Sequence, residues 1–119
     1  MAFERFTKTH GKESTPKVTI WRRGQIAISQ GGVDKFDVKQ FEFAVLFYDR
    51  ETKKIGIKLT NDSNEDGAIK INKKMRSGVS ISGKSFLTYY EIDFSKTIKY
   101  DVNDDKENQL LVINIKPKR

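Results

Sequence analysis

The sequence has 119 residues, enough for a single hydrophobic core and too few for two. Hydrophobic residues make up 36% and charged residues 33%, with a net charge of +7 and no cysteine, which excludes disulfides and thiolate metal sites. The longest apolar run, 43–48, is far shorter than a membrane span, and the N-terminus lacks the apolar core of a secretory signal. We therefore expect a soluble cytoplasmic protein with no membrane partner.

Residues 1–16 are polar and predict a flexible N-terminal arm, followed by a single β-rich domain over 17–119. The only histidine of the sequence, His10, falls in this arm. A general base or metal ligand must be held in place by its surroundings, so we expect no such role for His10. The serines have no base to activate them. We therefore predict that the protein is not an enzyme and uses no cofactor, metal or small-molecule substrate.

The first part of the domain predicts strands and a short helix. Alternating apolar residues lie on both sides of Arg22-Arg23-Gly24, and these residues are Val18, Ile20, Ile26 and Ile28. The pattern is typical of two strands around a tight turn or of one strand with a glycine bulge. Ser29 precedes apolar residues at helical spacing, which predicts a capped helix of one or two turns ending near Phe36.

A hairpin is predicted next. The run 41–48 predicts a buried strand, 49–54 a charged turn, and 55–59 a returning strand with period-two alternation. Residues 60–67 are rich in Asn, Asp, Ser and Gly, which is typical of a loop.

The second half repeats this order of elements. It predicts a short strand over 68–71, a basic turn over 73–78, a strand over 79–82 and a helix over 83–90. A strand over 97–102, a charged turn over 103–108 and a final strand over 110–115 follow. Gly24 and Gly78 are 54 positions apart, as are Phe36 and Tyr90. We therefore predict a mainly β fold with short helices: a pseudo-twofold β-barrel of two related β-turn-β-helix-β-hairpin units, about 17–59 and 68–115.

Two patterns in the sequence resemble ligand motifs without their context. Residues 78–85 match the letters of a phosphate-binding loop, but a genuine loop follows a buried parallel strand and enters a long helix. Here the intervening residues 79–82 alternate as a strand themselves. The acidic clusters in 62–66 and 101–105 lack the ligand order and closing glutamate of a calcium loop. We expect solvated turns at both acidic clusters.

The positive charge is unevenly distributed. Residues 1–25 carry a net charge of +4 and residues 61–86 of +2, whereas 87–119 are balanced. Basic residues in or beside the predicted turns and helices are the candidate nucleic-acid-binding residues: Arg22, Arg23, Lys35, Lys39, Lys73, Lys74, Arg76 and Lys84. Guanidinium and ammonium groups suit phosphate oxygens, and a local positive field attracts polyanions. Ordinary solubility charge is the alternative explanation.

The string Trp21-Arg-Arg-Gly-Gln-Ile-Ala-Ile-Ser29, followed by Phe36-Asp37-Val38 and a hairpin, resembles the swapped-hairpin unit of AbrB-type transition-state regulators. Two units in one chain resemble the MraZ arrangement, over about 17–59 and 75–115. The resemblance implies two interlaced units in one core and a DNA-binding regulator or antitoxin-like module. Only the basic glycine turns carry over from the family's contact residues, as Arg22, Arg23 and Arg76.

We therefore expect a DNA-binding transcription regulator that contacts phosphates and prefers DNA to RNA. A homodimer is possible, and the sequence leaves the oligomeric state open. A second hypothesis is a single-stranded nucleic-acid binder whose sheet-face aromatics stack bases. A third is a protein-interaction module, such as a phage- or plasmid-encoded inhibitor.

Overall fold

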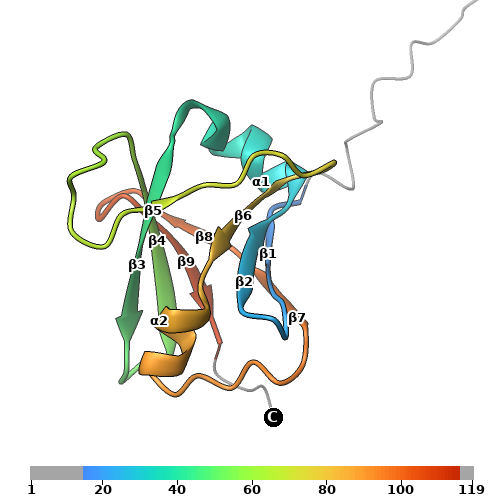
Figure 1. The fold of residues 1–119 in the computed structure, drawn as a ribbon, viewed down its shortest axis with the longest axis vertical. Helices are drawn as coiled ribbons and strands as arrows, with labels where there is room; N and C mark the ends of the chain where they lie inside the picture. The colour runs from blue at the N-terminus through green and yellow to red at the C-terminus, as the bar shows by residue number, and fades with distance from the viewer. Residues whose placement is uncertain (1–14, 116–119) are drawn as a thin grey trace, which may run out of the picture.

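The computed structural model describes residues 15–115, which form two antiparallel sheets and short helices (Figure 1). His10 and the predicted arm, apart from Thr15 and Pro16, lie outside the described residues. Sheet A contains, in spatial order, β6 (Val79–Ser82), β2 (Gln25–Ile28), β1 (Lys17–Ile20) and β7 (Ile98–Asp101). Sheet B contains β5 (Ile69–Lys70), β3 (Phe43–Asp49), β4 (Lys54–Thr60), β9 (Leu110–Asn114) and β8 (Asn103–Asp105). The mainly β prediction is confirmed.

Three short helices cover the ends of the sheets: α1 (Gln30–Lys35), the 3-10 helix η1 (Val38–Gln40) and α2 (Lys84–Tyr89). The predicted cap of the first helix is confirmed, because the Gly32 N–H donates to Ser29 Oγ at 3.2 Å. The same oxygen accepts the Lys17 N–H at 3.0 Å. One serine hydroxyl therefore fixes the start of α1 against the start of β1.

The hydrophobic core lies between the two sheets. Alternate residues of sheet A face inward, which places Ile26 and Ile28 against the side chains of sheet B. The fully buried residues include Val18, Ile26, Ile28, Ile55, Ile57, Val79, Ile81, Leu87 and Ile113. Burial of each such side chain stabilises the fold by about 1.5–3 kcal/mol relative to exposure.

The two sheets are joined at both edges. Strand β7 ends at Asp101, and after Val102 the chain enters β8 of sheet B. At the other edge, Asn72 follows β5 and pairs with Ser80 of β6 through two backbone hydrogen bonds of 2.8 and 3.1 Å. The two sheets are therefore linked at one edge by the continuous chain through Val102 and at the other by the hydrogen bonds between Asn72 and Ser80.

The structure departs from the predicted elements at β8 and at β3. Asn103–Asp105 form a strand paired with β9, where the sequence predicted the start of a turn. An edge strand with solvated side chains needs no apolar alternation, so its polar sequence gave no strand signal. The strand predicted as buried over 41–48 begins at Phe43 and leaves Phe47 45% exposed, because only one face of the antiparallel pair contacts the core.

One alternative that the sequence left open is resolved. Strands β1 and β2 form an antiparallel pair with Ile20 opposite Ile26, so Arg22-Arg23-Gly24 is a turn and not a bulge within one strand. Over residues 15–115, the structure contains no helix with the length and apolar character needed to cross a membrane.

Gly78 is the backbone position where we expect the largest cost of a methyl group. Its φ is +77°, and an added Cβ would lie 2.2 Å from the Ile28 carbonyl oxygen. Gly67 is a matched control, since its φ is +80° but its Cβ would meet only Val45 Cγ1 at 3.6 Å. Both alanine variants incur about 1–2 kcal/mol of left-handed strain. We expect Gly78→Ala to lower the free energy of unfolding by a further ~1–3 kcal/mol through steric overlap.

Urea unfolding followed by circular dichroism measures both variants. Equal losses for Gly78→Ala and Gly67→Ala would contradict the tight packing of β6 against the end of β2.

Candidate nucleic-acid interface

The turn between β1 and β2 presents two arginines at its tip. The Gly24 N–H donates to the Trp21 carbonyl at 2.8 Å, and the Trp21 N–H donates to the Gln25 carbonyl at 2.9 Å. Gly24 closes the turn with a φ of +93°, as in a three-residue hairpin loop that ends in a glycine bulge. Arg22 and Arg23 occupy the central positions, and both side chains are exposed.

This turn is anchored on two sides. The Arg22 N–H donates to Thr97 Oγ1 at 3.2 Å, and the Gly83 N–H donates to the Gly24 carbonyl at 2.9 Å. A Cβ on Gly24 would lie only 2.6 Å from Lys84 Cβ, so the absent side chain lets the first residue of α2 pack against the turn. The two arginines and Lys84 are therefore held on one rigid end of sheet A.

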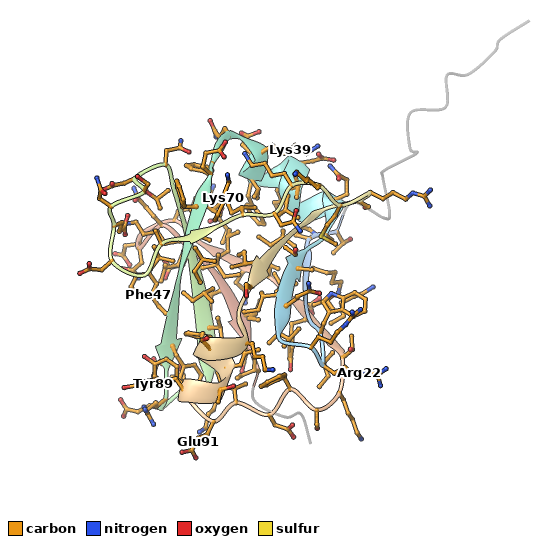
Figure 2. The ribbon with its side chains drawn as sticks, viewed as in Figure 1. Arg22, Lys39, Phe47, Lys70, Tyr89 and Glu91 are labelled. Atoms are coloured by element: carbon orange, nitrogen blue, oxygen red, sulfur yellow. The ribbon has the colours of Figure 1, made fainter. Side chains whose placement is uncertain are left out.

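Lys96 joins the same end of the molecule. A hollow of about 710 Å³ is lined by Trp21, Arg22, Arg23, Ser95, Lys96 and Thr97. We call Arg22, Arg23, Lys84 and Lys96 the tip cluster. Figure 2 shows Arg22 projecting outward beside the turn between β1 and β2.

Sequence reasoning missed Lys96, Ser95 and Thr97. They lie in the connection between α2 and β7, which has no periodic pattern, and residues 87–119 carry no net charge. Two contacts bring this connection to the arginines: β7 pairs with β1, with Ile98 opposite Ile20, and the Arg22 N–H donates to Thr97 Oγ1 across 75 positions.

Lys74 and Arg76 form a separate basic group. Strands β2 and β6 are antiparallel, with Gln25 opposite Ser82 and Ile28 opposite Val79. The turn that precedes β6 therefore lies at the opposite end of this ladder from the turn that precedes β2. Three residue steps separate the ends, or about 10 Å along the strands. The two predicted basic turns are thus two groups at either end of sheet A and do not form one patch.

Lys73 is engaged within the protein. Its Nζ lies 2.9 Å from Glu42 Oε2 and donates to the Lys39 carbonyl at 2.7 Å. The hydrogen bond from Lys73, together with its charge, lowers the pKa of the Glu42 carboxyl. Part of the positive charge of Lys73 is therefore neutralised, and Lys73 is a weaker candidate for phosphate contact than the sequence indicated.

Lys35 and Lys39 lie near carboxylates. The Lys35 Nζ is 5.8 Å from the centre of the Phe36 ring, and Lys35 shares a hollow with Asp37 and Asp104. Lys39 lines another hollow with Asp34 and Asp37. Figure 2 places Lys39 at the end of the molecule away from Arg22. These two lysines are outside the tip cluster.

The tip cluster and the Lys74–Arg76 group take no part in the ion pairs found within residues 15–115. Those pairs join Lys17 to Asp101, Lys58 to Glu65 and Lys73 to Glu42. Cations outside these pairs attract an external anion more strongly than paired cations do, and within the tip cluster Lys96 also interacts with the charge of Asp93.

The outer face of sheet A between the two basic groups has small side chains. Thr19 pairs with Ala27, and Ala27 pairs with Ser80, at positions that alternate with the inward-facing core residues. Ala27 and Ser80 are only 8% and 6% exposed, so neighbouring side chains cover most of this strip.

Residues 15–115 contain no group of three or more His, Asp or Glu side chains placed to hold a metal ion. Comparisons with protein families, with curated proteins and with solved structures found no match to this chain.

Glu42 provides a test of the contact that engages Lys73. Because its pKa lies below the ordinary 4.5 in the folded protein, its ionised form contributes stability above that pH. This contribution is lost as the pH falls through the lowered folded value. We expect Lys73→Ala to return the Glu42 pKa toward 4.5, measured by an NMR titration of its carboxyl carbon.

The matched control is Lys74→Ala, which removes the neighbouring charge without touching the hydrogen bond. A shift of the same size in both variants would show that general charge, and not the contact between Lys73 and Glu42, sets this pKa.

Proposed function

We propose that this chain is a nucleic-acid-binding domain, acting as a DNA-binding regulator, and that its basic turns contact phosphates. The observation that carries the proposal is the tip cluster, whose four cations take no part in the ion pairs of residues 15–115. Two of them lie on an anchored turn, so their backbone is already ordered before a ligand binds. Arg22 and Arg23 can each form bidentate hydrogen bonds with phosphate oxygens.

We also propose that the two halves of the chain are related units of a pseudo-twofold barrel. Left-handed backbone recurs at the same offset: Gly24 and Gly78 are 54 positions apart, and so are Asp37 and Glu91, with φ of 52° and 56°. The latter two directly follow Phe36 and Tyr90, which end α1 and α2. Left-handed backbone is uncommon outside glycine, which makes its recurrence at Asp37 and Glu91 informative.

The pairing of β2 with β6 supports the same relation. Ile26 pairs with Ile81, and Ala27 pairs with Ser80. A shift of 54 positions carries Ile26 to Ser80 and Ile81 to Ala27, so it exchanges these two pairs. A rotation that exchanges the two halves would therefore map this ladder onto itself.

The ladder between β4 and β9 behaves in the same way at an offset of 56. Ile55 pairs with Ile113, and Ile57 pairs with Leu111. A shift of 56 positions carries Ile55 to Leu111 and Ile113 to Ile57, so it exchanges these two pairs. The residues before these strands, Lys53 and Gln109, both have left-handed backbone at that offset. Closure of the barrel is supported by the joined edges at Val102 and at the Asn72–Ser80 bridge.

A twofold relation would make the two basic turns equivalent. Arg22 and Arg23 precede β2, and Arg76 precedes β6, at opposite ends of a ladder about 10 Å long. Both groups lie beyond the ends of this ladder, so one duplex lying along sheet A could contact both through its phosphates.

Fluorescence anisotropy with a labelled DNA duplex across a salt series tests the proposal. We expect binding whose logarithm falls linearly with the logarithm of the salt concentration. Arg22→Ala/Arg23→Ala and Lys74→Ala/Arg76→Ala should each weaken binding and reduce the slope by about 1 for every lost phosphate contact.

The control is Lys54→Ala/Lys106→Ala, which also removes two positive charges but acts at the hairpin turns of sheet B. Equal effects of all three double variants would mean that net charge alone drives binding. Absence of binding to duplex, single-stranded DNA and RNA at low salt would overturn the proposal and favour a protein-interaction module.

A further inference from the structure

Trp21 lies beside cations at the mouth of an open hollow. Its side chain is 40% exposed and lines the hollow with Arg22, Arg23 and Lys96. The volume of about 710 Å³ is within the range of about 300–1,000 Å³ typical of small-ligand sites. An exposed indole next to anion-binding side chains combines a flat stacking surface with phosphate ligands.

The lining of this hollow contains no carboxylate. Four other hollows in residues 15–115 each contain at least one, such as Asp49 and Asp105 beside Phe47. The nearest acid to Lys96 on the chain is Asp93, whose carboxylate accepts the Ser95 N–H at 2.9 Å. That hydrogen bond, with a smaller contribution from the charge of Lys96, lowers the pKa of Asp93. Asp93 itself lines a different hollow, with Tyr48 and Tyr100.

Two hydroxyl groups complete the lining. Thr97 Oγ1 accepts the Arg22 N–H at 3.2 Å, which leaves the hydroxyl hydrogen able to donate to a ligand. Ser95 lies two residues away on the same segment, and both its N–H and its hydroxyl hydrogen bond to the Asp93 carboxylate, so Thr97 is the hydroxyl of the two that faces a ligand with a hydrogen to donate. Hydroxyls can donate to and accept from the polar edge of a base or a sugar.

We infer that the hollow beside Trp21 receives one unpaired nucleotide, with its base stacked on the indole and its phosphate bound by Arg23 and Lys96. The inference rests on the proposed function and names its substrate class, DNA with a single-stranded segment. A base inside a duplex is covered on both faces by its neighbours, so it cannot stack on Trp21 unless it leaves the helix. Stacking tolerates any base sequence, because every base has a flat face.

Trp21 is the only tryptophan of the sequence, so its fluorescence reports directly on this site. The probes are an oligothymidine and a blunt-ended duplex of equal length. We expect oligothymidine to quench Trp21 emission and the duplex to leave it unchanged. Trp21→Ala should weaken oligothymidine binding roughly 5- to 150-fold, with an unchanged salt slope, because stacking releases no counterions. Trp21→Phe should restore most of the affinity.

Phe47→Ala is the matched control, because Phe47 is an equally exposed aromatic residue in acidic surroundings. It should leave the affinity for both probes unchanged. Wild-type affinity of Trp21→Ala for oligothymidine would overturn the stacking inference, and Phe47→Ala acting as strongly as Trp21→Ala would do the same.

The two proposals fail in different ways. Duplex binding that depends on Arg22 and Arg23, without Trp21 quenching by either probe, would retain the proposed function and overturn the nucleotide site. Binding of neither probe by the wild-type protein would overturn both.

Discussion

The antiparallel ladder between β2 and β6 is the contact on which the rest of the structure depends. It places Ile26 opposite Ile81 and Ile28 opposite Val79, and all four side chains are buried almost completely in the core. Because β6 leads directly into α2, the ladder also brings the start of that helix against the turn after β1. The positions of both basic groups follow from it, one at each end of the same four residue pairs.

Much of the fold could be predicted from local patterns. Period-two alternation located β1, β2 and β4, and Ser29 marked the start of α1 through the oxygen that accepts the Gly32 N–H. Two elements were missed where side chains carry no hydrophobic signal. Strand β8 consists of Asn103, Asp104 and Asp105, and only its backbone pairing with β9 makes it a strand. The helix η1 is a single 3-10 turn and had no sequence signature.

The candidate site was only partly predictable, because its membership depends on contacts between distant segments. Arg22 and Arg23 were evident as a basic pair beside a turn glycine, and Lys84 joins them through the approach of α2 to Gly24. Lys96 could not be found, since its segment is irregular and its region has no net charge. Lys73 looked equivalent to Lys74 in the sequence, but Glu42, 31 positions earlier, neutralises only Lys73.

The pairing of β1 with β7 has a consequence for the synthesis of the chain. Lys17 lies opposite Asp101 in this ladder and hydrogen bonds to it across 84 positions. At about 5–20 residues per second, a ribosome needs roughly 4–17 s to make the intervening residues. Until β7 emerges, β1 has β2 on one side and an open edge on the other. Sheet A can therefore be completed only after β7 has left the ribosome, and the charge of Lys17 on that edge opposes pairing with other chains in the interval.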